Sequence, residues 1–238
     1  MTDLEKAREW LARATSVAAL TGSGISAESG VPTFRGTGGL WKEFKPEELA
    51  TPEAFARDPR LVWEWYNWRR ELIAKAAPNA AHRALVDLEL RKPRFTLITQ
   101  NVDGLHDLAG SGKILKLHGD IWRMRCTQCG ANFPNRRVPL TKIPPHCACG
   151  GLARPGVVWF GEPLPDGMMQ EAEHAAASAQ VFLVIGTSAM VYPAAGLIPH
   201  AKKAGARVIE INPEEGPMSS IADSVFQGPA GEWLPQLL

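Results

Sequence analysis

The four cysteines of the chain fall in two tight pairs, a spacing that favours a metal ion over disulfide bonds. Two residues separate Cys126 from Cys129, and after 17 intervening residues one residue separates Cys147 from Cys149. Thiolates are good ligands for Zn²⁺, and four of them complete a closed, structural site. The loop is rich in proline, so we expect the metal to supply much of its folding energy. His146 stands beside the second pair, and a ligand set of three cysteines and one histidine is the alternative.

A glycine-rich turn follows the apolar run at residues 17–20. Gly22, Gly24 and Ala27 fit the G-x-G-x-x-G/A pattern, in which backbone N–H groups can approach a phosphate because no Cβ intervenes. The acidic residue that usually confirms a dinucleotide site, about 20 positions on, is not convincing here. On its own the pattern therefore leaves a plain tight turn as the alternative.

Polar side chains follow the apolar runs that we expect to be strands. Gln100, Asn101 and Asp103 follow one run, and His118 follows the next. The carboxyl ends of parallel strands share one edge of a sheet, so these groups should meet there. An imidazole titrates near neutrality, and we expect His118 to be a general base; a structural histidine is the alternative. Further strand ends carry Gly186, Thr187, Ser188 and Asn212.

Tyr66 and Arg69 lie three residues apart on an expected helix over residues 59–76, so they project from one face. A guanidinium beside a phenol can hold a carboxylate by charge-assisted hydrogen bonds. The alternative is an amphipathic helix with a solvated arginine.

Several stretches, in this order along the chain, resemble the sirtuins, the NAD-dependent protein-lysine deacylases. They are residues 24–35, 99–106, 117–119, 186–188 and 211–214, and the resemblance runs from about residue 15 to about 232. It implies removal of acyl groups from protein lysines with consumption of NAD, giving nicotinamide and O-acyl-ADP-ribose. His118 matches the histidine that takes a proton from a ribose hydroxyl.

The resemblance also implies which residues surround the cofactor. Arg35 would pair with the diphosphate, and Phe34 would shield the reactive ribose carbon from water. Asn101 and Asp103 would line the pocket for nicotinamide and its ribose. The implied cofactor-binding residues are Gly22, Ser23, Gly24, Ile25, Ala27, Glu28, Thr33, Phe34, Arg35, Trp41, Gln100, Asn101, Val102, Asp103, Gly186, Thr187, Ser188, Asn212, Pro213, Glu214 and Ala230.

The implied substrate is an acylated lysine in a protein. Residues 157–161, where the chain returns to the main domain, could be an ordinary core strand, and in the family this segment pairs with the substrate backbone. Tyr66 and Arg69 resemble the signature of the subclass that removes succinyl and malonyl groups, and Ala50 matches a small residue that leaves room for a longer acyl chain. Acetyl groups should also be removed, and a plain deacetylase is the alternative. The implied substrate residues are Ala50, Tyr66, Arg69, Val158, Trp159, Phe160 and Gly161.

Short apolar strands alternate with helical stretches, which predicts an α/β fold with a parallel sheet. Helices are expected from a capping box at Thr2 and Glu5, after a cap at Asn79, near 166–178 and near 192–204. We expect one catalytic unit over residues 1–238. Its Rossmann-like sheet comprises residues 1–35, 80–121 and 157–238, with a helical insert at 36–79 and a zinc module at 122–156.

Composition and charge limit the partners and the location that we expect for the protein. The 238 residues are 45% hydrophobic and 21% charged, with a net charge of +1, so neither nucleic acid nor a membrane surface is an expected partner. No apolar run reaches about 20 residues, and the first residues lack a signal peptide's apolar region. We expect a cytoplasmic monomer. Two alternative functions are an NAD oxidoreductase that uses the same glycine loop and a zinc-ribbon binding module without catalysis.

Overall fold

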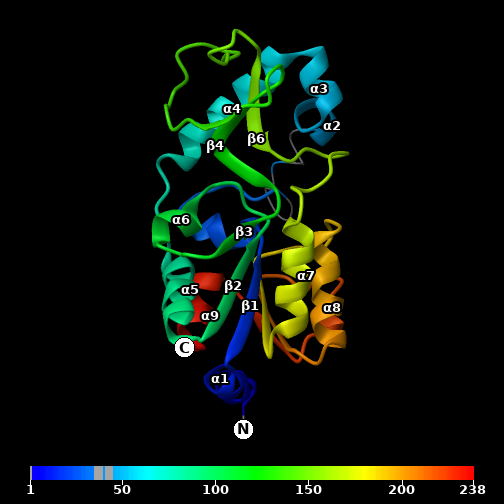
Figure 1. Ribbon diagram of the computed structural model, residues 1–238. Helices are drawn as coiled ribbons and strands as arrows, with labels where there is room; N and C mark the ends of the chain where they lie inside the picture. The colour runs from blue at the N-terminus through cyan, green and yellow to red at the C-terminus, as the bar shows by residue number, and fades with distance from the viewer. Residues whose placement is uncertain (1, 35–39, 41–44) are drawn as a thin grey trace.

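The fold is built on a six-stranded parallel sheet, seen in a computed structural model that describes residues 2–34, 40 and 45–238 (Figure 1). The strand order is β3-β2-β1-β7-β8-β9, with every neighbouring pair parallel. This arrangement confirms the predicted α/β class. The strands are β1 (Ser16–Thr21), β2 (Arg94–Thr99), β3 (Ile114–Lys116), β7 (Val181–Ile185), β8 (Arg207–Asn212) and β9 (Ser224–Gln227).

Helices cover both faces of this sheet, and the central strands are therefore apolar on both sides. In β1, Val17 and Ala19 pack with the helices on one face, while Ala18 and Leu20 pack with those on the other. Figure 1 shows α5 and α9 on one side and α7 and α8 on the opposite side. The first face is covered by α1 (Asp3–Arg13), α5 (Ala80–Arg91) and α9 (Ala230–Gln236), and the second by α7 (Met168–Ser178) and α8 (Leu197–Lys203).

A smaller antiparallel sheet and a group of helices form the rest of the molecule, in the upper part of Figure 1. They share a separate apolar core, in which Trp63 and Trp122 are buried. The strands are β4 (Gly119–Cys126), β5 (Asn132–Pro134) and β6 (Ala153–Val157), in the order β5-β4-β6. The helices are α2 (Pro46–Leu49), α3 (Pro52–Arg57) and α4 (Pro59–Ile73), and short helix α6 (Leu105–Ala109) lies beside α5.

The predicted starts of the first helix and of the helix after Asn79 are correct. Thr2 and Glu5 form the capping box of α1, and the Asn79 side chain caps α5. Helix α4 ends at Ile73 instead of Ala76. No helix in the described ranges is both long and apolar enough to cross a membrane.

The predicted strand at residues 157–161 is wrong, because β6 ends at Val157 and pairs with β4 in the small sheet. Beyond it the chain turns: the Trp159 N–H donates to the Glu162 carboxylate, and Gly161 has a φ of +85°. The apolar character of Trp159 comes from burial in the second core, which one side chain can achieve without a strand.

Candidate active site

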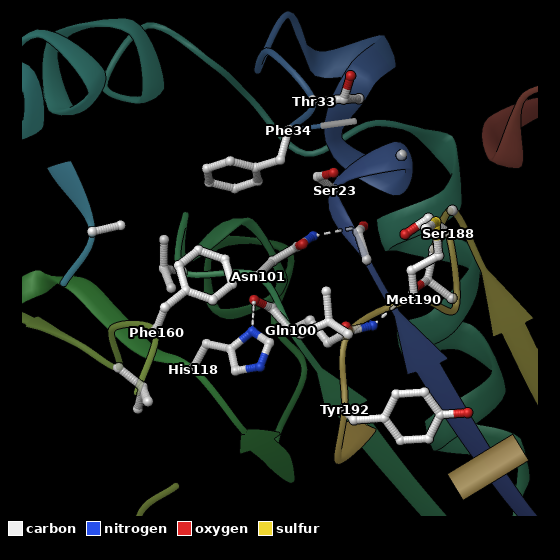
Figure 2. Close-up of a pocket in the computed structure, with 18 of the residues that line it drawn as sticks. Ser23, Thr33, Phe34, Gln100, Asn101, His118, Phe160, Ser188, Met190 and Tyr192 are labelled. Atoms are coloured by element: carbon white, nitrogen blue, oxygen red, sulfur yellow. Dashed lines mark hydrogen bonds between the residues drawn. The ribbon is translucent and has the colours of Figure 1, made fainter. Parts of the chain in front are cut away.

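A cavity of about 650 Å³ lies between the carboxyl edge of the large sheet and the smaller part of the molecule. Figure 2 shows His118, Phe34 and Phe160 on one side and Ser188 and Met190 on the other. Most predicted site residues line it, from segments far apart in the sequence. These are Gly22, Ser23, Gly24, Ala27, Thr33, Phe34, Ala50, Tyr66, Arg69, Gln100, Asn101, Val102, His118, Val158, Trp159, Phe160, Gly161, Gly186, Thr187, Ser188, Asn212, Pro213 and Glu214.

Four predicted cofactor residues do not line the cavity. Ile25 is fully buried in the first core, and Ala230 is buried at the start of α9. The exposed Glu28 accepts a hydrogen bond from the Gly231 N–H, which ties the glycine loop to α9. Asp103 lies behind the cavity wall. Arg35 and Trp41 lie outside the described residues.

Sequence reasoning missed a group of lining residues that follow β7 and β8. Their only signal was position: they continue past strand ends already predicted to face the site. Residues near 192 were instead taken as the start of a helix, which begins only at Leu197. The added residues that follow β7 and β8 are Met190, Val191, Tyr192, Pro193, Glu215, Gly216 and Pro217, and Trp65, Val157, Glu162 and Leu164 line the cavity from other segments.

The glycine loop, which continues as the 3₁₀ helix η1 (Ser23–Ser29), packs directly on the turn after β7. The Gly24 N–H donates to the Gly186 carbonyl at 2.8 Å. A Cβ at Gly22 or Gly24 would come within 2.7 Å of Gly186, and one at Gly186 within 2.3 Å of the Ile25 nitrogen. Gly22 and Gly24 are therefore required for backbone-to-backbone packing at this edge, whatever else the loop binds.

Hydrogen bonds join the ends of β2, β7 and β8. The Gln100 side-chain amide donates to the Thr187 hydroxyl at 2.9 Å. The Asn212 amide donates to the Thr187 carbonyl at 2.8 Å and to the buried Glu210 carboxylate at 2.9 Å. Three strand ends that face the cavity are therefore fixed relative to one another.

His118 is held with its proton on a defined nitrogen. Its Nδ1 lies 3.0 Å from the Gln100 carbonyl oxygen (Figure 2), and a carbonyl can only accept, so Nδ1 carries the hydrogen. Nε2 then keeps its lone pair. Burial lowers the pKa of His118, opposed by the bond to Gln100, so the imidazole is neutral at neutral pH. A neutral, oriented imidazole can take a proton.

Asn101 is fixed from behind by a short chain of side chains. Its amide donates to the Gly22 carbonyl at 3.0 Å and lies 3.3 Å from the Ser26 hydroxyl. Ser26 in turn donates to Asp103 at 2.8 Å. Burial raises the pKa of Asp103, opposed by hydrogen bonds from the Leu105 N–H and Ser26. Asp103 therefore orients Ser26 and, through it, Asn101 of the cavity wall.

Tyr66 and Arg69 reach the cavity from α4, and both side chains are buried, with 3% and 6% of their surface exposed. The Trp159 indole N–H donates to the Tyr66 hydroxyl oxygen at 3.0 Å, which leaves the hydroxyl hydrogen free to donate elsewhere. The Arg69 guanidinium lies 4.5 Å from the Phe34 ring centre and 4.9 Å from that of Trp65. Burial lowers the pKa of Arg69 and raises that of Tyr66. The pair combines a desolvated cation with a neutral hydroxyl.

The four predicted cysteine ligands come together. All four sulfur atoms lie within 4.8 Å of one another, with Cys126 and Cys149 3.5 Å apart and Cys129 and Cys147 3.8 Å apart. Tetrahedral Zn²⁺ with bonds of about 2.3 Å places its sulfurs about 3.8 Å apart, so the cluster fits zinc. The backbone N–H groups of Cys129 and Gln128 donate to Cys126 and lower the pKa of its thiol.

The cluster excludes His146, whose backbone pairs with Leu152 instead. Strand β4 begins beside His118 and ends at Cys126, and its eight residues span about 25 Å. A metal ion bound by the four cysteines would therefore lie too far from the cavity to contact a ligand there, and its role would be structural.

A glycine loop and oriented polar groups at the carboxyl edge of a parallel sheet define a nucleotide-binding enzyme of the Rossmann-like class. The family model that describes the "Sir2 family" matches residues 22–193. The chain belongs to the Sir2 family.

Individual relatives cover nearly the whole chain. An "NAD-dependent protein deacylase" of Aquifex aeolicus is 57% identical over 93% of this chain and 93% of that protein. A solved mutant of a Sir2 homologue, in complex with ADP ribose, is 47% identical, with a TM-score of 0.95 over 100% of this chain and 95% of that one. A solved complex of a Sir2 homologue with NAD is 49% identical, with a TM-score of 0.92 over 98% and 91%.

The cysteine cluster predicts one tightly bound Zn²⁺ per chain. Cys126→Ser should release the metal and lower the melting temperature by more than about 5 °C, because a structural site contributes directly to folding. Elemental analysis and thermal unfolding measure both effects. Gln128→Ala, in the same loop with all four thiols kept, is the control and should retain the metal. Zinc-free wild-type protein, or full zinc in Cys126→Ser, would contradict the assignment.

Proposed function

We propose that this member of the Sir2 family is an NAD-dependent protein-lysine deacylase that prefers acyl groups ending in a carboxylate, namely succinyl and malonyl, and also removes acetyl. NAD is consumed, and the products are free lysine, nicotinamide and O-acyl-ADP-ribose. NAD dependence and lysine deacylation are supported by the family and by the deacylase relatives. The acyl preference depends on the residues of the cavity.

The single observation that carries the preference is the buried Arg69 guanidinium in the cavity wall. Among the described residues, no carboxylate lies within salt-bridge distance of it. Aromatic rings offset only part of the cost of burying a cation. A carboxylate on the ligand would complete the site, accepting from Arg69 and from the Tyr66 hydroxyl. Ala50 leaves room beside them because its side chain is one methyl group.

The segment Val158 to Gly161 is proposed to hold the acyl-lysine and its peptide backbone. Three of its N–H groups are already used: Val158 donates to the His118 carbonyl, Trp159 to the Glu162 carboxylate and Phe160 to the Ala50 carbonyl. Within this segment the Gly161 N–H and the Val158 carbonyl are left for a peptide strand. Trp159 links the peptide-binding segment to the acyl site, because it lies in the cavity wall and its indole N–H donates to the Tyr66 hydroxyl.

Bound NAD would supply an activated ribose carbon for attack by the acyl oxygen. The protein's part is to hold that ribose, exclude water and move a proton. Asn101, fixed on Gly22 and Ser26, would hold the nicotinamide end, and Phe34 would cover the reacting carbon. His118 would take the proton of a ribose hydroxyl on Nε2, while Nδ1 stays bonded to Gln100. The remaining cofactor residues, from Gly22 to Glu214 in the cavity wall, would contact the dinucleotide.

Loss of His118 tests the proton transfer. His118→Ala should lower kcat/KM by about 100- to 10,000-fold while the fold and bound zinc are kept. The wild-type enzyme should hold a constant kcat/KM near pH 7 and lose it only as the pH falls through the pKa of His118, which lies below the ordinary value of about 6.5. His174→Ala, on the exposed face of α7, is the matched control. A folded His118→Ala enzyme with near-normal turnover would show that another group is the base.

Loss of Arg69 tests the acyl preference. A charge-assisted pair is worth about 1.5–3 kcal/mol and about 1.4 kcal/mol is tenfold, so Arg69→Met should cut succinyl-lysine turnover at least about tenfold. Acetyl-lysine lacks the carboxylate, and its turnover should fall little or rise. The measured quantity is the ratio of the two kcat/KM values on matched peptides.

Tyr66→Phe should move the same ratio in the same direction by less, because one neutral donor is removed. Arg60→Met, which removes an exposed arginine from the same helix, should leave the ratio unchanged. Equal losses of both activities in Arg69→Met would make Arg69 structural and favour the plain deacetylase.

A further inference from the structure

Helix α4 has two faces with different partners. Tyr66 and Arg69 face the cavity, while Trp63, Asn67 and Arg70, spaced four and three residues apart, form another stripe along the helix. Figure 1 shows α4 beside β4 and β6 of the small sheet. All three side chains of this second stripe bond to residues 135–153, the stretch from just after β5 to the first residue of β6.

The bonds of the second stripe reach three separate points of that segment. The Trp63 indole N–H donates to the Ala153 carbonyl at 2.7 Å, and the Leu140 N–H donates to the side-chain oxygen Oδ1 of Asn67 at 2.9 Å. Arg70 Nη2 donates to both the carbonyl and the side-chain oxygen of Asn135, at 2.7 and 2.8 Å, and to the Arg137 carbonyl at 3.2 Å. Helix α4 is therefore anchored on the cysteine module by its side chains.

Arg70 is the costly member of this stripe. Its side chain is fully buried, its Nε and Nη1 have no hydrogen-bond partner, and in the described part of the chain no carboxylate forms a salt bridge with it. An apolar side chain would fill the same space without leaving two buried donors unsatisfied. What an apolar residue could not do is bind three oxygens of residues 135–137 at once. Arg70 therefore fixes the position of α4 relative to residues 135–137, at the expense of the folding stability that an apolar side chain would give.

We propose that Arg70 is a positioning residue for acyl specificity: by clamping α4 to residues 135–137 of the cysteine module, it holds Tyr66 and Arg69 in register with the acyl carboxylate. The inference depends on the proposed function, because it assumes that these two side chains bind the carboxylate. The metal enters only indirectly, since the clamp can be no firmer than the module that supplies its acceptors.

Specificity should respond more than basal turnover, for a geometric reason. Charge-assisted hydrogen bonds weaken steeply when distances or angles change, so a small shift of α4 would cost the succinyl substrate both donors. An acetyl group makes neither bond and contacts only the walls of the cavity. A loosened α4 therefore lowers the ratio of the two activities, whereas a general loss of stability lowers both together.

The test compares Arg70→Met and Arg70→Lys in the full-length, zinc-loaded enzyme. Equilibrium dissociation constants and kcat/KM are measured for succinyl-lysine and acetyl-lysine peptides of one sequence, and zinc is quantified in each variant. Arg70→Met should lower the succinyl-to-acetyl ratio about three- to tenfold, in binding as well as in kcat/KM, with zinc retained. Arg70→Lys, which can still donate to these carbonyls, should recover part of the ratio.

Two controls separate positioning from stability. Arg60→Met removes an arginine from the exposed side of α4, and Leu88→Ala opens a cavity in the other core, on α5. Both variants should keep the wild-type succinyl-to-acetyl ratio. For Leu88→Ala this should hold even if its melting temperature falls as much as that of Arg70→Met. If Arg70→Met does not fold, Asn67→Ala replaces it and should shift the ratio in the same direction by less.

The variants separate the positioning role of Arg70 from carboxylate binding by Arg69. If Arg69→Met leaves the ratio at its wild-type value, the carboxylate is not bound there and the proposed function fails. If Arg69→Met collapses the ratio and Arg70→Met, like Asn67→Ala, leaves it intact, the acyl site stands and the positioning role of Arg70 is overturned. A ratio that falls equally in Leu88→Ala also overturns it.

Discussion

The site depends on a backbone contact in which no side chain has room. The glycine loop after β1 lies on the turn after β7 so closely that Cβ atoms at Gly22, Gly24 or Gly186 would collide with the opposite backbone. Gly186 also has a φ of +58°, where glycine costs least. This contact places the loop and the β7 end at one wall of the cavity. The strand-end hydrogen bonds then fix Gln100, Thr187 and Asn212 on that frame, and the Gln100 carbonyl orients the His118 imidazole.

The parallel sheet was predictable because its signal is local and repeated. Five of its six strands are short apolar runs followed by a polar group, and parallel strands bring these groups to one edge, whereas β9 was not predicted. Asn101, His118, Ser188 and Asn212 line the cavity for that reason. The paired cysteines were predictable for a similar reason, since their spacing allows four sulfurs to meet.

The sequence did not reveal the surroundings of Trp159 and Asp103 in the folded chain. The apolar run 157–161 was interpreted as a strand, but the Trp159 N–H donates to Glu162 in a turn and its ring packs in the second core. Asp103 looked like a ligand contact because it follows a strand, yet the Ser26 hydroxyl and Leu105 N–H take up its carboxylate behind the wall. Glu162 and Leu105 are near neighbours in sequence of the residues that they bond, whereas the Ser26–Asp103 bond joins residues 77 positions apart and depends on the tertiary fold.

Arg69 and Arg70 show how far adjacent residues of one type can diverge. The sequence offers two neighbouring arginines on one helix, and the turn of the helix sends them to different faces. Both are desolvated, and among the described residues neither forms a salt bridge. Arg70 is compensated by carbonyl oxygens of its own chain, which makes it part of the framework. Arg69 has aromatic faces for neighbours at the cavity wall, and the charge interactions that favour its cation come from Tyr66 and Asp103.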